Sequence, residues 1–168
     1  MRQHKRVKKM IPFSEAKRIG ILYDSTSEKH YEVVKLFVKT IRAQQKDVLA
    51  LGYYDKKELP ETRYAKLGLD FFTRKSLNWY LKPHHPVINN FINSDFDILI
   101  NLNIEKSFPL KYISAHAKAK FKIGRYHKLN TPYCDMMIHT EENISLGKFI
   151  EQVLHYLNLL KNERAQKT

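Results

Sequence analysis

The fold is decided by residues 18–54, which read RIGILYDSTSEKHYEVVKLFVKTIRAQQKDVLALGYY. Residues 18–24 form a nearly continuous apolar run, typical of a strand that is covered on both faces. Ser25 and Glu28 have the spacing of a capping box at the start of a helix. Four apolar residues then recur at helical intervals: Tyr31, Val34, Val38 and Ile41. A second apolar strand over residues 47–54 completes a βαβ unit, which we expect to be parallel and right-handed.

The rest of the chain repeats this alternation of strands and helices. Further strands are predicted over residues 70–75, 96–102, 121–126 and 134–139, and helices over residues 87–92, 107–119 and 146–160. Such an order predicts a single-domain α/β three-layer sandwich, with a mostly parallel open sheet of about five strands and helices on both faces. The chain then divides into a basic N-terminal arm at residues 1–17, the domain at 18–160 and a basic C-terminal tail at 161–168.

The charge of the chain is unevenly distributed. The formal net charge is +13, and the stretch of residues 106–128 holds seven Lys or Arg side chains with no Asp or Glu. A second basic cluster opens the arm. Such segregated charge attracts polyanions, so we expect a non-enzymatic protein that binds RNA. The predicted RNA-binding residues are Arg2, Lys5, Arg6, Lys8, Lys9, Lys106, Lys111, Lys118, Lys120, Lys122, Arg125 and Lys128.

The local patterns suggest how these residues meet RNA. On the helix at 107–119, Leu110 and Ile113 turn inward, which leaves Lys111, Ser114, His116 and Lys118 facing water. Strand alternation places Lys120 and Lys122 on one face. Lysines outnumber arginines here, which favours phosphate contacts over base readout. Trp79 and Tyr80 lie near basic residues and are candidate stacking platforms for unpaired bases.

The arm is expected to order only against an anionic partner, because residues 1–9 contain few apolar side chains. Basic extensions of a compact body are typical of proteins embedded in structured RNA. By this analogy we expect ribosomal RNA and neighbouring ribosomal proteins as partners.

Catalytic, metal and cofactor motifs do not emerge from the sequence. The chain has five glycines and no Gly-x-Gly-x-x-Gly or P-loop pattern, and its eight histidines lack zinc-hydrolase spacing. Cys134 is the only cysteine, so no intrachain disulfide can form and a cytoplasmic location is expected. No apolar run approaches the ~20 residues of a membrane span. We therefore expect no cofactor, no metal and no membrane insertion.

Two other functional classes remain open. Ligands of open α/β sheets bind beyond the carboxyl ends of strands, which places a candidate anion site at Ser25, Thr26 and Ser27, opposite residues 101–105. The alternative function is therefore a flavodoxin-like small-molecule or phospho-ligand domain, although Ser25 as a simple helix cap explains the same pattern. An interaction module for an acidic protein, or for an anionic membrane surface, fits the arm as well.

One segment of the chain resembles an uncharacterised family of small bacterial proteins with a flavodoxin-like strand and helix pattern. This segment runs from Phe96 through Ser107 and Ala115 to Gly124. The stretch of residues 107–115 is its most distinctive part, and the resemblance extends over residues 13–160. It implies a one-domain bacterial cytoplasmic protein. It implies no activity and transfers no site residue.

Overall fold

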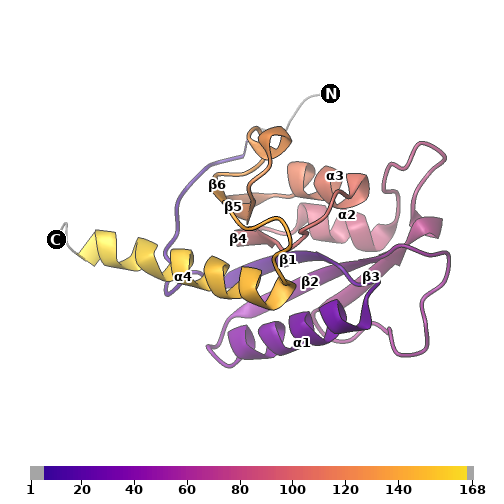
Figure 1. Ribbon diagram of the computed structural model, residues 1–168, viewed down its shortest axis with the longest axis horizontal. Helices are drawn as coiled ribbons and strands as arrows, with labels where there is room; N and C mark the ends of the chain where they lie inside the picture. Colours follow the sequence, from indigo (N-terminus) through magenta and orange to yellow (C-terminus); the bar gives the residue numbers. More distant parts are fainter. Residues whose placement is uncertain (1–5, 166–168) are drawn as a thin grey trace.

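The computed structural model describes residues 6–165, with side chains described through residue 160. One open sheet of six parallel strands forms the centre, in the order β3-β2-β1-β4-β5-β6 (Figure 1). The strands are β1 (Arg18–Asp24), β2 (Asp47–Tyr54), β3 (Leu69–Thr73), β4 (Phe96–Asn101), β5 (Ala119–Arg125) and β6 (Met136–Ile138). The predicted α/β sandwich is thus confirmed, with six strands where about five were expected.

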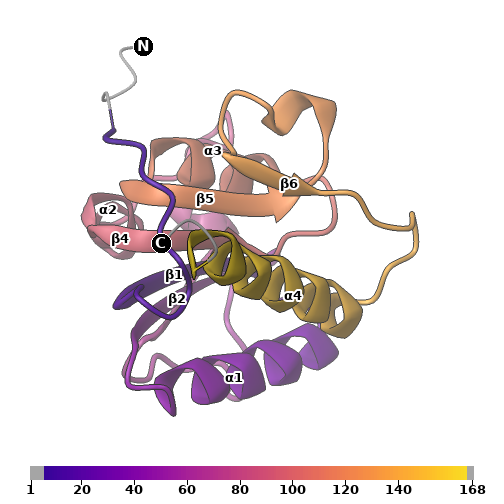
Figure 2. The same cartoon turned by 90° about the vertical axis from the view of Figure 1, so that its left-hand side faces the viewer.

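Helices cover both faces of the sheet. They are α1 (Glu28–Arg42), α2 (Pro86–Asn93), α3 (Phe108–His116) and α4 (Leu146–Ala165), with short 3-10 helices η1 (Arg74–Ser76) and η2 (Lys128–Asn130). Figures 1 and 2 show α1 and α4 on one face and α2 and α3 on the other. The core is correspondingly divided into two clusters, one around Val34 and Phe149 and the other around Phe91 and Phe96.

The strand order reverses between β1 and β4. The chain first builds outward from β1 to β3, then returns to place β4 on the other side of β1. This 3-2-1-4-5-6 order is that of dinucleotide-binding α/β folds, whereas flavodoxin has the order 2-1-3-4-5. The alternation of strands and helices expected from the sequence is thus confirmed, and the structure adds a strand order that differs from that of flavodoxin. The crevice at such a reversal, beyond the carboxyl ends of β1 and β4, is the usual ligand site of open α/β sheets.

The predicted element boundaries shift by a few residues. Ser27, and not Ser25, is the N-cap of α1, and its hydroxyl accepts from the backbone N–H of His30 at 3.4 Å. Helix α3 ends at His116 and β5 already begins at Ala119. Helix α4 runs to Ala165 and so includes the first part of the predicted tail.

Part of the predicted arm belongs to the domain. Ile11, Phe13 and Ala16 are buried in the core cluster on the α1 and α4 face. The backbone N–H of Lys9 donates to the carbonyl of Lys120 at 2.9 Å, and Figure 2 shows this indigo segment crossing β4 and β5. Residues 6–17 are therefore packed on the body, which corrects the expectation of a separate arm over this range.

Gly20, at the centre of β1, is required by close packing against β4. A Cβ placed there would lie 2.9 Å from carbons of the Phe96 ring. Phe96 is itself buried, at 1% exposure, so its ring has little room to move. We predict that Gly20→Ala lowers the free energy of unfolding by about 1–3 kcal/mol, the usual cost of overpacking a core. Urea denaturation measures this difference.

Gly147 is the matched control, because a Cβ at this position of α4 has no neighbour within 4 Å. Gly147→Ala is expected to keep or slightly raise stability, since alanine favours helix more than glycine does. Equal stability of the two variants would contradict the packing argument.

Candidate nucleic-acid interface

A groove of about 790 Å³ lies at the amino-terminal ends of β4 and β5. Residues from the N-terminal segment, the end of α3, the start of β5 and the loop before β6 form its walls. We call it the basic groove; its lining is Arg6, Val7, Lys8, Asp95, Phe96, Ala115, His116, Ala117, Lys118, Ala119, Lys120, Lys122, Pro132 and Tyr133. Five of the predicted RNA-binding residues therefore meet in one place: Arg6, Lys8, Lys118, Lys120 and Lys122.

Asp135 fixes the N-terminal wall of the basic groove. Its carboxylate forms ion pairs with Arg6 at 2.6 Å and with Lys8 at 3.7 Å, and it accepts from the backbone N–H of Lys122 at 2.9 Å. Arg6 also donates to the carbonyls of Ala119 and Lys120, at 3.1 and 3.3 Å. These bonds hold two cationic side chains against β5, although the chain itself separates them from Asp135 by more than a hundred residues.

Asp97 plays a similar role for Lys120. The ammonium of Lys120 lies 2.9 Å from this carboxylate, which also accepts from the backbone N–H groups of Lys17 and Arg18. Burial alone would raise the pKa of Asp97, but the bonds from Lys120, Lys17 and Arg18 outweigh it, so the pKa lies below its usual value. Asp97 is therefore ionised at neutral pH and offsets part of the groove's positive charge.

Lys122 is not a surface residue, contrary to the sequence-based expectation. It is 2% exposed, and its ammonium donates to the carbonyls of Ser114 at 2.7 Å and Ala115 at 3.3 Å. Ser114, also expected to face water, is 3% exposed. Burial, followed by the nearby charge of Arg6, lowers the pKa of Lys122 to about 8. Lys122 thus supports the groove wall and is not available for direct phosphate contact.

The other predicted cationic residues are distributed differently. Lys118 is exposed and forms no ion pair within the described part of the chain, and Lys9 is also exposed. Lys106, Lys111, Arg125 and Lys128 do not line the groove. Arg2 and Lys5 lie outside the described residues. The predicted RNA-binding residues are therefore divided between a compact groove and separate positive charges elsewhere.

Arg125 has a structural role that the sequence did not indicate. Its guanidinium donates to the hydroxyl of Thr140 at 2.8 Å and to the carbonyls of Ile104, Glu141 and Glu142. These bonds join the loop after β4 to the loop before α4. Because its donors are used within the protein, Arg125 is corrected from a phosphate contact to a loop-bridging residue.

Trp79 and Tyr80 stand on a loop between η1 and α2, outside the lining of the basic groove. Trp79 is 91% exposed and Tyr80 is 53% exposed. Their rings contact one another edge to face, with centroids 4.9 Å apart. Both candidate stacking residues are therefore accessible to a partner.

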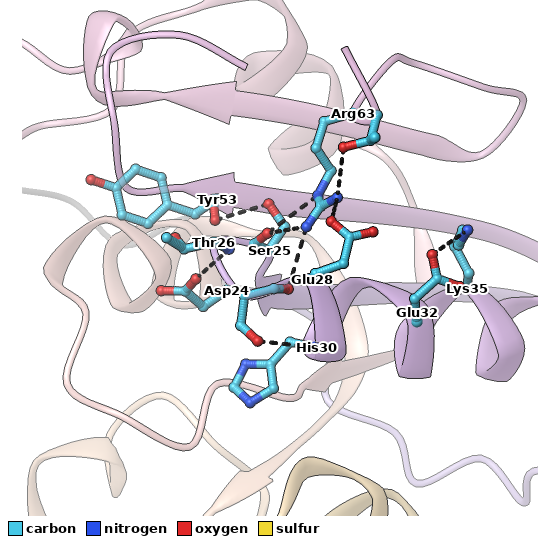
Figure 3. A network of polar contacts seen from close by, with 11 residues as sticks. Asp24, Ser25, Thr26, Glu28, His30, Glu32, Lys35, Tyr53 and Arg63 are labelled. Atoms are coloured by element: carbon cyan, nitrogen blue, oxygen red, sulfur yellow. Dashed lines mark hydrogen bonds and ion pairs between the residues drawn. The ribbon is translucent and has the colours of Figure 1, made fainter. Parts of the chain in front are cut away.

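A second cavity, of about 340 Å³, lies at the reversal between β1 and β4. It is formed by residues after β1, β2 and β4, and its polar lining consists of Asp24, Thr26, Ser27, His30, Asp55, Asn103 and Glu105. We call it the switch-point cavity. Figure 3 shows the polar network at its β1 side.

Each of the three hydroxyls predicted to hold an anion forms a hydrogen bond within the protein, and Figure 3 shows the one donated by Ser25. Ser25 donates to the carbonyl of Tyr53 at 3.1 Å, Thr26 accepts from the N–H of Asp55 at 2.9 Å, and Ser27 caps α1. Three carboxylates, those of Asp24, Asp55 and Glu105, line the same cavity and oppose a bound anion. The carboxylates therefore disfavour an anion beside Ser25, Thr26 and Ser27, and the anion site stays a prediction.

Arg63 is a buried residue that stabilises the turn between β1 and α1. It is 3% exposed, and it donates to the carbonyls of Ser25 at 3.0 Å and Ser27 at 3.3 Å (Figure 3). It also forms an ion pair with Glu28 at 2.6 Å and stacks 3.9 Å above the Tyr31 ring. The Arg63 guanidinium therefore stabilises the carbonyl groups of the turn, and Arg63 is not among the residues that line the switch-point cavity.

Among the described residues, no group of three or more His, Cys, Asp or Glu side chains has a metal-binding arrangement. None of the described helices has the length and apolarity needed to cross a bilayer.

A comparison with protein families gives one match, which spans residues 1–160. The chain belongs to a family of unknown function (DUF6913). The resemblance to an uncharacterised family, inferred from the sequence, is thereby confirmed. Searches of curated proteins and of solved structures gave no significant match.

Sequence reasoning missed the residues that organise this DUF6913 chain. Asp135 is visible in the sequence as the first carboxylate after the basic stretch, but its pairing with Arg6 depends on the tertiary fold. Asp97 appears in the sequence only as a polar residue inside an apolar strand. Arg63 lies in a segment without periodicity, and no local signal marks it as buried.

The buried ammonium of Lys122 predicts a pH dependence of stability. In the unfolded chain Lys122 has the ordinary lysine pKa of 10.5, so between about pH 8 and 10.5 the unfolded chain binds more protons than the folded chain. The contribution of Lys122 to the free energy of unfolding therefore rises with pH across this window. Lys122→Met removes the titrating group, so the wild-type protein should gain stability relative to the variant from pH 7.5 to 9.5 in urea denaturation.

Lys118→Met is the matched control for this experiment, because Lys118 is an exposed neighbour in the same groove. Its stability is expected to follow the wild-type pH profile. Parallel profiles of wild type and Lys122→Met would show that Lys122 titrates normally in the folded state.

Proposed function

We propose that this protein is a non-enzymatic RNA-binding protein that holds the phosphate backbone in the basic groove. The observation that carries the proposal is the convergence of four cationic side chains, from segments far apart in the sequence, on one concave surface whose wall the buried Lys122 supports. They are Arg6, Lys8, Lys118 and Lys120. Phosphate contacts require reachable positive charge and no particular base geometry. Ribosomal RNA is the proposed target, because basic extensions on a compact body are typical of proteins embedded in structured RNA.

The electrostatics of the groove support a polyanion as the ligand. Four cationic side chains of the groove outnumber the nearby carboxylates of Asp95, Asp97 and Asp135, and the buried ammonium of Lys122 adds to this excess. The side chain of Lys8 is 67% exposed and that of Lys120 is 51% exposed. Exposed ion pairs contribute only about 0–1 kcal/mol, so phosphate groups can replace these carboxylates at small cost.

The paired variant Lys8→Ala/Lys118→Ala tests the proposal. Each phosphate contact contributes about 0.7–0.9 to the slope of log K against log salt, so losing two contacts should flatten this slope by about 1.4–1.8. Affinity for RNA from purified ribosomes should fall at low salt and converge with wild type at high salt. Filter binding at several salt concentrations measures both effects.

Lys29→Ala/Lys39→Ala provides a control with the same change in net charge. These exposed lysines lie on α1, on the opposite face of the sheet from α3. An equal loss of RNA affinity in this control would indicate attraction by net charge alone. An unchanged salt slope in Lys8→Ala/Lys118→Ala would refute RNA binding in the basic groove. Complexes that survive nuclease in a lysate gradient would instead indicate an acidic protein partner.

The switch-point cavity supports a second candidate function, which is the binding of a small molecule. Its location matches the usual ligand site of this strand order. Its carboxylates favour hydroxyl or amine donors over phosphate. Asp55 in particular keeps its charge, because a hydrogen bond from Arg74 lowers its pKa. We therefore propose a neutral or cationic ligand in place of the phospho-ligand expected from the sequence.

Thermal unfolding with adenosine, spermidine and AMP tests this second candidate. A ligand at ten times its Kd contributes about 1.4 kcal/mol, which corresponds to a rise of about 3–6 °C in Tm. Adenosine or spermidine should raise Tm, whereas AMP should not, and Glu105→Gln should reduce the shift. Glu151→Gln, an exposed acidic residue of α4, is the control. A larger shift with AMP than with adenosine would refute the proposed ligand class.

A further inference from the structure

Helix α3 carries a stripe of rings on its outer side. Phe108, Tyr112 and His116 follow one another at four-residue intervals, so they share one face of the helix. The rings of Phe108 and Tyr112 lie 6.4 Å apart, and those of Tyr112 and His116 are stacked at 4.1 Å. The core-facing side of α3 is formed mainly by Leu110 and Ile113. Tyr112 is half-buried against the same core cluster, and Phe108 is 53% exposed. The exposed part of this stripe is therefore not needed to anchor the helix.

A preformed loop presents further apolar side chains beside this stripe. Asn78 closes the loop, since its backbone N–H donates to the carbonyl of Lys82 at 3.0 Å and its side-chain oxygen accepts from the N–H of Lys82 at 2.8 Å. At the tip, Trp79, Tyr80 and Leu81 are all more than half exposed. Leu81 has φ +65°, a left-handed conformation that is costly for a leucine. The tip thus keeps three large side chains in water in a defined conformation.

Contacts connect the loop, the stripe and the basic groove. The ammonium of Lys82 lies 5.7 Å from the centre of the Tyr112 ring, which joins the loop to α3. At the other end of the stripe, His116 lines the basic groove next to Lys118. Tyr133 also lines the groove and is approached by Lys111 at 5.7 Å. An ammonium group therefore lies between the rings of the loop and the stripe, and another lies at the groove end of the stripe.

Neighbouring rings and cations match the chemistry of an unpaired RNA strand. Its bases expose their faces for stacking and its phosphates require positive charge, whereas a duplex hides its base faces and is read by backbone and shape. We propose that the RNA held in the basic groove is single-stranded, and that its bases stack on the track formed by Trp79, Tyr80, Phe108, Tyr112 and His116. This inference rests on the proposed function and adds the class of RNA.

Trp79 makes the proposal directly measurable, because it is the only tryptophan of the chain. Titration with an unpaired RNA oligonucleotide should quench its fluorescence, and a duplex of the same length should leave the emission nearly unchanged. Phe108→Ala is expected to weaken binding of the unpaired strand about 5- to 100-fold, the range for losing one stacked base. Binding of the duplex should change less than twofold.

Leu36→Ala is the matched control, since Leu36 is an exposed apolar residue, at 67%, on the far helix α1. It should bind both RNAs like the wild type. The variant Lys8→Ala/Lys118→Ala should weaken the binding of unpaired and of duplex RNA to the same extent. This separates attraction to the phosphate backbone from stacking of the bases.

The outcomes distinguish this inference from the proposed function. Equal binding of unpaired and duplex RNA, with no quenching of Trp79 and normal affinity of Phe108→Ala, would overturn the single-strand inference while groove binding stands. Absence of binding to either RNA would overturn both. Quenching of Trp79 by anionic lipid vesicles but not by RNA would assign the track to a membrane surface and refute the inference.

Discussion

Because layers of helices cover both faces of the sheet, the positions open to charged side chains are restricted. Strands β1, β2 and β4 are apolar and buried along most of their length. Charges placed in the middle of such a sheet would be desolvated on both sides, at high cost unless paired. Polar chemistry is therefore confined to the two ends of the strands and to the loops. Both the basic groove and the switch-point cavity follow from this constraint.

The cavities at the two ends of the sheet are lined by charges of opposite sign, in a way that agrees with the helix dipoles. At the carboxyl ends, where the positive N-terminus of α1 lies, the cavity is lined by Asp24, Asp55 and Glu105. At the amino ends, where the negative C-terminus of α3 lies, the ammonium of Lys122 donates to the last carbonyls of the helix. The N-terminal segment adds further cations only at this second end. A phosphate-bearing partner is therefore favoured at the amino ends and disfavoured at the carboxyl ends.

The sequence predicted the elements of this fold because strands and helices leave local periodic signals. The apolar runs and the helical spacing identified all six strands and four helices, apart from shifts of a few residues. Alternation also placed Lys120 and Lys122 on the same face, yet one is exposed and the other buried, because α3 covers only Lys122. Pairings such as Arg6 with Asp135, or Arg63 with Ser25, join segments far apart in the chain. No local pattern encodes these pairings, so the groove itself was not predictable.

Asp135 and Asp97 help to form the basic groove even though their charge opposes a polyanion. Without Asp135, Arg6 and Lys8 would lose the carboxylate that holds them against β5, and their mutual repulsion would favour dispersal into solvent. With it, both cations are already in place, so in the proposed function less side-chain freedom is lost when RNA binds. The side chain of Lys8 is 67% exposed, so its Coulomb energy with Asp135 is modest and a phosphate group can share or replace the carboxylate there. The side chains of Arg6 and Asp135 are only 15% and 13% exposed, so their pair stays in place. Carboxylates at these positions therefore organise a phosphate site more than they neutralise it.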